Sequence, residues 1–290
     1  MSGYVGSKEI TEVYVGNKEV TEIYKGSDLI YSSHQPVSNF LFRDIDANGI
    51  LSAATGVLDS GVGLNKLKPR VLQTAFYNYT SPPIGQLTGE VNLSDLRSIS
   101  EGSLSSAFSS QTGLTSVDLS KLTIINGQYA LSNAFYSTRL VNVNFPELTT
   151  IKGQYALNQA FRSCVSLRTI SFPKLTTIEN AYRCFYQTFD RCSNLESVSF
   201  PLLSNIIGTT DFVNAFSSCT GLTQVSFPSL ISNNFTSGNN IDFTNMLSGV
   251  TGCTVHFPSN LQAVIGNRSD VTSGFNGTNT VILFDLANTE

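Results

Sequence analysis

The sequence has little of what most catalytic, metal-binding and nucleic-acid-binding sites require. Its 290 residues include no Trp, two His and five Cys, and charged residues amount to 13%, about half the share usual in globular proteins. A net charge of −4 argues against a surface that binds nucleic acid phosphates. No stretch approaches the roughly 20 apolar residues of a membrane-spanning helix, so we expect no membrane insertion.

The start of the chain lacks a basic segment followed by an apolar one, so we expect no secretory signal. Five cysteines are an odd number, which argues against a complete disulfide framework. Together these absences predict folding in a reducing cytoplasm.

Catalytic motifs are missing as well. The sequence contains no P-loop, no G-x-S-x-G and no H-E-x-x-H pattern. Of the two histidines, His34 lies in a segment with Ser and Pro, and His256 has no evident carboxylate companion. Acid–base and nucleophilic catalysis need such groups in combination. The sequence therefore predicts no enzyme activity, no cofactor and no metal.

Short polar residues and β-forming residues take the place of charges. Ser, Thr and Asn number 38, 28 and 25, and the 41% apolar share includes 19 Phe. This apolar share is too high for a disordered chain, and β-branched and aromatic residues suit strands. We therefore expect a β-rich protein with a neutral, hydroxyl-rich surface.

Residues 1–31 contain a ten-residue repeat. A Tyr begins each copy and a Gly two residues later begins a polar turn, at Tyr4 and Gly6, Tyr14 and Gly16, and Tyr24 and Gly26. Gly-Ser and Gly-Asn turns between alternating runs indicate short strands in a small β-meander. About 30 residues bury little core alone, so we expect this module to attach the chain to a partner or to further copies of itself; the alternative is a flexible tail.

A longer repeat, with 26 to 30 residues between copies, covers most of the remaining chain. Each copy contains Leu-x-x-Val-x-Phe, usually followed by Pro, and an Ala-Phe pair stands ten or eleven residues before the last Phe in most copies. The last position of the motif is Leu119, Phe145, Phe172, Phe200, Phe227 and, in a shorter copy, Phe257. Apolar residues at every second place predict strands, and their recurrence predicts a solenoid in which neighbouring coils bury each other's apolar faces.

The expected fold is mainly β, with a solenoid of about seven coils over residues 75–261. Equivalent strands should stack in parallel about 4.8 Å apart, so that like residues form buried ladders. One such ladder is Val117, Val143, Ile170, Val198 and Val225. The Ala-Phe segments should return the chain through one or two helical or 3-10 turns. We expect a hinge at 32–39, a cap or degenerate first coil at 40–74, and a C-terminal cap at 262–290 whose last strand is Val281–Leu286.

At these residues the chain resembles a known family. The unit L-x-x-V-x-F-P-x-L-T-T-I, joined to A-F-x-x-C, is similar to the BspA-type, or Treponema-type, leucine-rich repeat, most clearly in Ala160–Cys164 and Leu167–Ile178. This resemblance covers about residues 75–261 and implies a right-handed solenoid with a parallel sheet. The Tyr-x-Gly module and the closing segment from Gly252 to Leu286 resemble phage fibre or virion-surface proteins of gut bacteria.

Exposed strand positions are the first candidates for a ligand-binding surface. Between the inward residues stand mostly short polar side chains, which suit hydrogen bonds with a neutral or sugar-like ligand. The candidates are Asp118, Asn142, Asn144, Arg168, Glu196, Gln224 and His256. The alternative is a solvated sheet face that has no partner.

Three tyrosines are secondary candidates. Tyr129 and Tyr155 occur in matching Gly-Gln-Tyr-Ala-Leu segments, and Tyr182 is near the same place one coil later. Tyr has an apolar ring and one polar end, so it suits either of two roles. The three rings either form an exposed ribbon that stacks on sugars or cover the edge of the core.

One segment matches the opening of a calcium loop. Asp44, Asp46 and Asn48 are spaced as in D-x-[DN]-x-[DN]-G, but the twelfth position, where a bidentate carboxylate is expected, is Thr55. The same residues equally fit a β-turn.

Three cysteines follow Phe by three residues at the same place in adjacent coils. Cys164, Cys192 and Cys219 could pair or bind a soft metal. The interpretation we favour is that they are small buried residues with free, reduced thiols.

These features predict a non-enzymatic phage virion fibre or receptor-binding protein. The N-terminal module would join it to other virion proteins, and the solenoid would present its surface to a protein or glycan receptor on a bacterial host. Such a protein would be assembled in the host cytoplasm and reside on the virion, where copies could associate. The alternative is a BspA-type cell-surface adhesin that binds host matrix or other cells. A polysaccharide depolymerase ranks last, because no paired carboxylates stand out on the strands.

Overall fold

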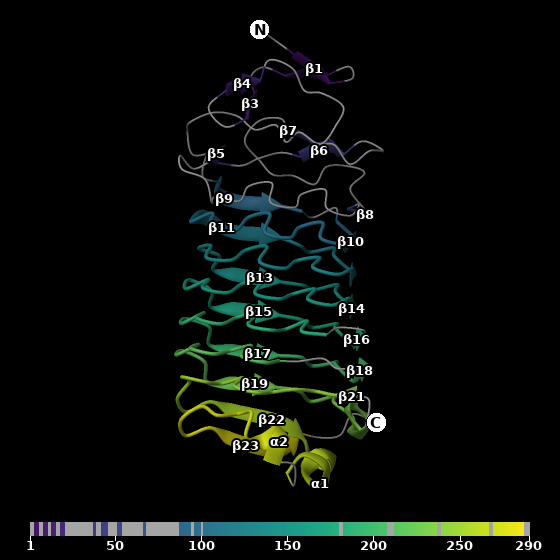
Figure 1. Ribbon diagram of the computed structural model, residues 1–290, viewed down its shortest axis with the longest axis vertical. Coiled ribbons are helices and arrows are strands. Elements are labelled where there is room, and N and C mark those ends of the chain that lie inside the picture. Colours follow the sequence, from purple (N-terminus) through teal and green to yellow (C-terminus); the bar gives the residue numbers. More distant parts are fainter. Residues whose placement is uncertain are drawn as a thin grey trace.

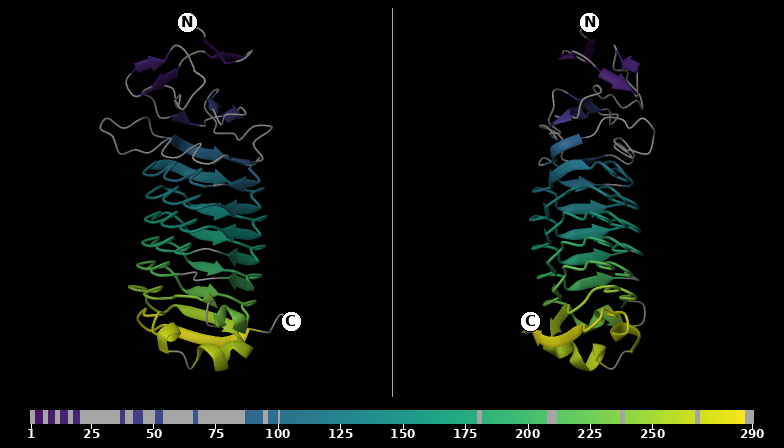
Figure 2. Two further views of the ribbon diagram at one scale, coloured as in Figure 1. Left: turned by 45° about the vertical axis from the view of Figure 1, so that its right-hand side comes forward. Right: turned by 90° about the vertical axis from the view of Figure 1, so that its left-hand side faces the viewer.

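The computed structural model describes eight short strands between residues 3 and 67, and residues 87–286 apart from 94–95, 100, 180–181, 208–211, 237–238 and 267–268. Successive coils stack along one axis from residue 87 towards the C-terminal end, where two short helices lie (Figures 1 and 2). Two parallel sheets run along this stack.

The larger sheet follows the predicted strand repeat. Its strands are β5 (Val37–Ser38), β9 (Leu87–Asn92), β11 (Gly113–Asp118), β13 (Asn142–Asn144), β15 (Thr169–Ser171), β17 (Ser197–Ser199), β19 (Gln224–Ser226), β22 (Thr254–Pro258) and β23 (Val281–Leu286). They are paired in parallel in the order β23-β22-β19-β17-β15-β13-β11-β9-β5. The strand expected at Val281–Leu286 therefore extends this sheet as its last strand.

The smaller sheet lies on another side of the stack, and the expected fold does not include it as a separate sheet. It consists of β8 (Lys66–Leu67), β10 (Ser98–Ile99), β12 (Ile124–Asn126), β14 (Thr150–Lys152), β16 (Thr177–Glu179) and β18 (Asn205–Ile207). Its central Ile residues are buried in register, with Ile125 opposite Ile151 and Ile151 opposite Ile178. The Thr-Thr-Ile part of the repeat thus forms a second short strand in each coil.

The core between the sheets consists of the predicted ladders. Phe145, Phe172, Phe200, Phe227 and Phe257 are fully buried and form a stack with ring centroids 5.1 to 5.6 Å apart. A second stack joins the Phe residues of the Ala-Phe pairs and continues through Phe189, at 5.3 to 5.7 Å. The Val and Ile ladder of the larger sheet is buried as well. Both ladder predictions are confirmed, because the coil repeat places like residues above one another.

The return side of each coil, which we call the turn wall, consists of tandem turns. It comprises residues 101–111, 127–138, 153–164, 182–192 and 212–219. Backbone N–H groups alternate there: the N–H of Leu131 donates to Ala156 O in the next coil at 2.8 Å, and that of Ser132 donates three residues back to Tyr129 O at 3.1 Å. Every fourth residue takes a positive φ, for example Tyr129, Asn133 and Ser137 at 53 to 57°.

The turn wall corrects the expectation of helical turns in the return segments. A helix bonds its N–H groups within its own segment. Here half of the N–H groups instead cross to the neighbouring coil, which stacking brings within hydrogen-bond distance. The i→i+3 bonds are of the 3-10 type, but the residues with positive φ interrupt them before a helix forms.

A buried asparagine ends the smaller sheet. After β18 the chain forms a 3-10 turn, η1 (Ser232–Asn234), and a hairpin of β20 (Phe235–Thr236) and β21 (Asn239–Asn240). The Asn234 side chain accepts the N–H of Ile206 at 3.0 Å and donates to Ser204 O at 2.8 Å. Among the described residues, no further strand follows β18 at this edge of the sheet. The side-chain amide of Asn234 bonds the backbone groups that such a strand would have paired with.

The C-terminal end carries the short helical elements η2 (Ser259–Leu261), α1 (Gln262–Ile265) and α2 (Ser269–Thr272) between β22 and β23. In the part of the chain that the structure describes, no helix is long and apolar enough to cross a membrane.

Six of the eight described strands near the N-terminus form antiparallel pairs. β1 (Gly3–Val5) pairs with β2 (Lys8–Ile10), β3 (Val13–Val15) with β4 (Lys18–Val20), and β6 (Phe42–Ile45) with β7 (Leu51–Ala53). Tyr4 and Tyr14 lie in β1 and β3. The third copy with Tyr24, the turn residues Gly6, Gly16 and Gly26, and two residues of the segment that matches the opening of a calcium loop, Asp46 and Asn48, lie outside the described residues.

Candidate binding surface

The exposed face of the larger sheet from β11 to β22, here called the strand face, brings most of the predicted binding residues together. In one row Asn142 lies opposite Thr169, Ser197 opposite Gln224, and Gln224 opposite Thr254. A second row two residues further along contains Asn144, Ser171, Ser199, Ser226 and His256, of which Ser226 is buried. The parallel register thus aligns short polar side chains at the coil spacing.

Hydrogen bonds between coils hold part of these rows in place. Thr169 Oγ1 donates to Asn142 Oδ1 at 2.7 Å, and Ser171 Oγ donates to Asn144 Oδ1 at 3.2 Å. An asparagine whose oxygen is bonded in this way keeps two N–H donors for another partner. Both asparagines are exposed, so the strand face presents oriented amide groups to solvent.

The charged candidates on the strand face contribute less. Arg168 Nη1 lies 3.7 Å from Glu196 Oε1, and both side chains are more than 60% exposed, so this ion pair is weak. Asp118 Oδ1 accepts the N–H of Ser120 at 2.8 Å and so stabilises the turn after β11. Gln224 is exposed.

His256 has a carboxylate partner, which corrects the expectation from the sequence. Its Nδ1 lies 2.9 Å from Asp285 Oδ1 on the neighbouring strand β23. Ser226 faces His256 in register on the other side, but its hydroxyl donates to Ser199 Oγ at 2.8 Å. Since the serine hydroxyl is directed to another serine, these three residues are not arranged as a nucleophile and its base.

The secondary candidates form a separate feature, the tyrosine ridge, which we define as Tyr129, Tyr155 and Tyr182 with Arg183 and Tyr186. Tyr129 and Tyr155 stack at 4.9 Å with an interplanar angle of 12°, and Tyr155 meets Tyr182 edge-on at 5.6 Å. Tyr129 and Tyr182 are each 41% exposed. Two of the three rings are therefore in contact with solvent, which is the arrangement that an exposed ribbon requires.

A close backbone approach supports the ridge. Gly153 has φ +113°, and a Cβ at this position would meet backbone atoms of Gly127 at 2.5 Å. Only glycine fits at position 153, which explains the Gly that precedes Gln154 and Tyr155. In the next coil, Arg183 takes the place that Tyr155 has in its own coil, with a positive φ of 52°. Tyr182 lies one residue earlier, and its carbonyl oxygen accepts the N–H of Tyr155.

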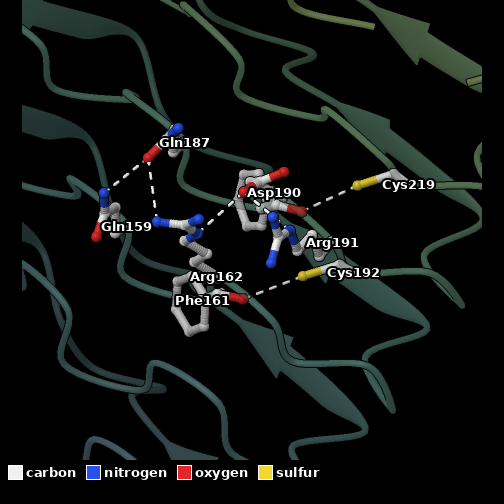
Figure 3. Close-up of polar contacts among 9 residues, drawn as sticks. Gln159, Phe161, Arg162, Gln187, Asp190, Arg191, Cys192 and Cys219 are labelled. Atoms are coloured by element: carbon white, nitrogen blue, oxygen red, sulfur yellow. Dashed lines mark hydrogen bonds and ion pairs between the residues drawn. The ribbon is translucent and has the colours of Figure 1, made fainter. Parts of the chain in front are cut away.

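A buried polar network lies in the turn wall (Figure 3). Asp190, whose side chain is 7% exposed, has its Oδ2 2.9 Å from Arg162 Nε and 3.8 Å from Arg191 Nε. Gln187 Oε1 accepts Gln159 Nε2 at 2.7 Å and Arg162 Nη1 at 3.4 Å. Sequence reasoning missed this network, although the separation of 28 residues between Arg162 and Asp190 is one coil.

The cysteine column is buried and bonded to backbone. Cys164 Sγ donates to Phe135 O at 3.0 Å, Cys192 Sγ to Phe161 O at 3.1 Å, and Cys219 Sγ to Phe189 O at 2.9 Å (Figure 3 shows the last two). All five cysteines of the chain are free and buried, which confirms the free-thiol prediction.

Burial also suppresses ionisation of these thiols. Desolvation raises the pKa of Cys164 to about 11, against a hydrogen bond from Thr138 that lowers it, and raises the pKa of Cys253 to about 12. The pKa values of Cys192 and Cys219 are raised further, again mainly by burial. Metal binding needs thiolates. Within the described residues, no three His, Cys, Asp or Glu side chains are grouped to hold a metal ion.

Comparison with known proteins identifies the repeat. A family model described as the BspA type leucine rich repeat region, with 6 copies, matches residues 74–159 and 131–262. No curated protein matches the chain.

Two solved structures are similar to this chain at low identity. One is a leucine rich cell surface protein from Faecalibacterium prausnitzii A2-165, with 14% identity, 98% of this chain and 96% of that chain covered, and a TM-score of 0.26. The other is a leucine-rich repeat protein from Bacteroides ovatus ATCC 8483, with 13% identity, 85% and 99% covered, and a TM-score of 0.20. The family match alone spans residues 74–262, which is more than half of the sequence. On the strength of that match and of the repeated coils it covers, this chain belongs to the BspA-type leucine-rich repeat family.

Proposed function

We propose that this chain is a non-enzymatic recognition protein that binds a neutral, hydroxyl-rich receptor on a bacterial surface through its strand face. The observation that carries the proposal is the pair of aligned polar rows on consecutive parallel strands. From β13 to β19 the outward residues of the strands are Ser, Thr, Asn and Gln. Side chains of this kind offer both donors and acceptors and carry no charge that would select an ionic ligand.

Repetition adds to the proposal. Strands that stack about 4.8 Å apart present the same polar group several times, so a ligand with its own repeat can make several weak contacts at once. The hydrogen bonds that Asn142 and Asn144 accept from the next coil fix the orientation of these amides before a ligand arrives. Such pre-orientation lowers the entropy cost of binding.

We further propose that this chain is a phage virion fibre or receptor-binding protein. Its residues 1–31 would attach it to other virion proteins. The ten-residue repeat supports this, because it is too short to bury a core without a partner. A cell-surface adhesin is the second candidate, and it is supported by the family match over residues 74–262. A chain without residues 1–31 should still form the solenoid but no longer join purified particles, and normal incorporation of that truncated chain would exclude an attachment role.

The binding proposal is tested by changing four strand-face residues together. In the test variant Asn142, Arg168, Glu196 and Gln224 are all replaced by Ala. These side chains are exposed, so each replacement should change the free energy of unfolding by no more than about 0.5 kcal/mol. Adsorption of the folded protein to intact bacterial cells is then measured, and we expect it to fall by about tenfold or more.

The smaller sheet offers a matched control with the same chemistry. Asn126, Lys152, Glu179 and Asn205 also include two amides and an ion pair, and they lie on β12, β14, β16 and β18. Their replacement by Ala should leave adsorption unchanged. Equal adsorption of the strand-face variant and the parent protein would show that the receptor contacts another surface.

A further inference from the structure

The tyrosine ridge lies apart from the strand face. Tyr129 and Tyr155 follow β12 and β14 by three residues, so they stand at the corner where the smaller sheet passes into the turn wall. The smaller sheet separates this corner from the larger sheet in every coil. A function of the ridge therefore does not depend on the proposed function of the strand face.

The backbone at the ridge does not favour tyrosine. Tyr129 and Tyr155 both have φ 57°, in the left-handed region, where bulky residues are strained and glycine is not. Gly102 occupies the equivalent position one coil earlier, with φ 59° and with its N–H bonded to Gln128 O as that of Tyr129 is bonded to Gln154 O. The coil geometry is thus compatible with glycine, and the tyrosines are present for their rings.

The stack of rings is closed at one end and open at the other. Arg183 lies 5.3 Å from the centroid of the Tyr182 ring and 5.1 Å from that of Tyr186, so a cation covers the ridge on the C-terminal side. On the N-terminal side Gly102 contributes no side chain above Tyr129. One face of the Tyr129 ring packs on Tyr155, and the side chain is 41% exposed, so we assign the opposite face of the ring to a ligand.

We propose that the tyrosine ridge is a second binding site, which takes a sugar ring of a neutral glycan on the open face of Tyr129. The C–H face of a pyranose packs on an aromatic ring, and its hydroxyls need polar partners at the rim. Exposed amides supply them in the same two coils: Gln128 and Gln154, each one residue before a tyrosine of the ridge. A cationic ligand fits less well because Arg183 occupies the ridge. A proline-rich peptide docks in an aromatic groove, whereas these rings form a single file.

The site is tested by calorimetric titration with cellohexaose, maltohexaose and chitohexaose, three neutral linear glycans. Tyr129→Ala removes the platform and should weaken binding about tenfold or more, while Tyr129→Phe keeps the ring and should bind as the parent does. A second variant, Gly102→Arg, leaves every tyrosine in place but covers the open face. It should also abolish binding, as Arg183 shows that arginine is accepted at this position of the coil.

Ser110→Arg is the matched control for the second variant. Ser110 has φ 62° in the same coil as Gly102, and Arg191 takes the equivalent place in a later coil at φ 64°. This control adds the same charge and should bind like the parent. The proposal is overturned if none of the three glycans binds, if Gly102→Arg binds as tightly as Ser110→Arg, or if a polyproline peptide binds instead. Loss of glycan binding only in the strand-face variant would exclude the ridge but not the proposed function.

Discussion

Raising the pH from 8 to 10 should destabilise the solenoid through three buried thiols. Cys164, Cys192 and Cys219 stand in one column of the turn wall, fully buried, with each sulfur bonded to a backbone carbonyl. Burial disfavours the thiolate, which raises the pKa of Cys164 from 9.0 to about 11 and those of the other two further. In the unfolded chain the same thiols ionise near their ordinary pKa.

The sign and the size of the loss in stability follow from the difference between the folded and the unfolded pKa values of these thiols. A group whose pKa is raised by folding contributes stability that is intact below its unfolded pKa and lost as the pH rises towards its folded pKa. At pH 10 each unfolded thiol has released nearly one proton and each folded thiol almost none. This costs about 1–2 kcal/mol per thiol, and about 4 kcal/mol for the three together.

Urea unfolding followed by far-UV circular dichroism at pH 8 and pH 10 measures this loss. The control is the variant in which all three cysteines are replaced by Ala, since tyrosines and lysines titrate equally in both proteins. The parent protein should lose about 4 kcal/mol more than the variant between the two pH values. Equal losses, or rapid labelling of the three thiols by a thiol reagent in the native protein at pH 8, would refute the argument.

Three single substitutions and one double variant test the packing and the polar contacts. Phe172→Ala removes a fully buried ring from the middle of its stack and should lower the free energy of unfolding by about 3–5 kcal/mol in urea titration; a loss below about 1 kcal/mol would contradict tight stacking. Asn234→Ala leaves two backbone groups at the end of the smaller sheet without partners and should cost about 2–3 kcal/mol, with hydrogen exchange at Ile206 accelerated. Asp190→Asn leaves the charge of Arg162 without its partner and should lower the free energy of unfolding by about 3 kcal/mol. Adding Arg162→Gln to this variant should restore part of the loss, and no recovery would argue against the ion pair.

Several contacts between coils could have been found from the repeat period alone. Arg162 and Asp190 are 28 residues apart, and His256 and Asp285 are 29 apart, each close to one period. The second pair depends on β23 continuing the larger sheet past β22, whereas the sequence predicts a cap over residues 262–290. Asn234 had no such signal, because it lies in an irregular turn outside the repeated motif.

By itself the sequence determined the solenoid, the register of its main strands and the composition of its core. A repeated Leu-x-x-Val-x-Phe motif can bury its apolar side chains only by placing like residues above one another, so period and pattern suffice. Only the tertiary structure decided the backbone of the return side and the exposure of the tyrosines. Apolar residues four apart suit a helix and a chain of tandem turns equally, and the choice between them depends on N–H groups that bond to the next coil. Those bonds join residues about one period apart, so no single copy of the repeat contains the information.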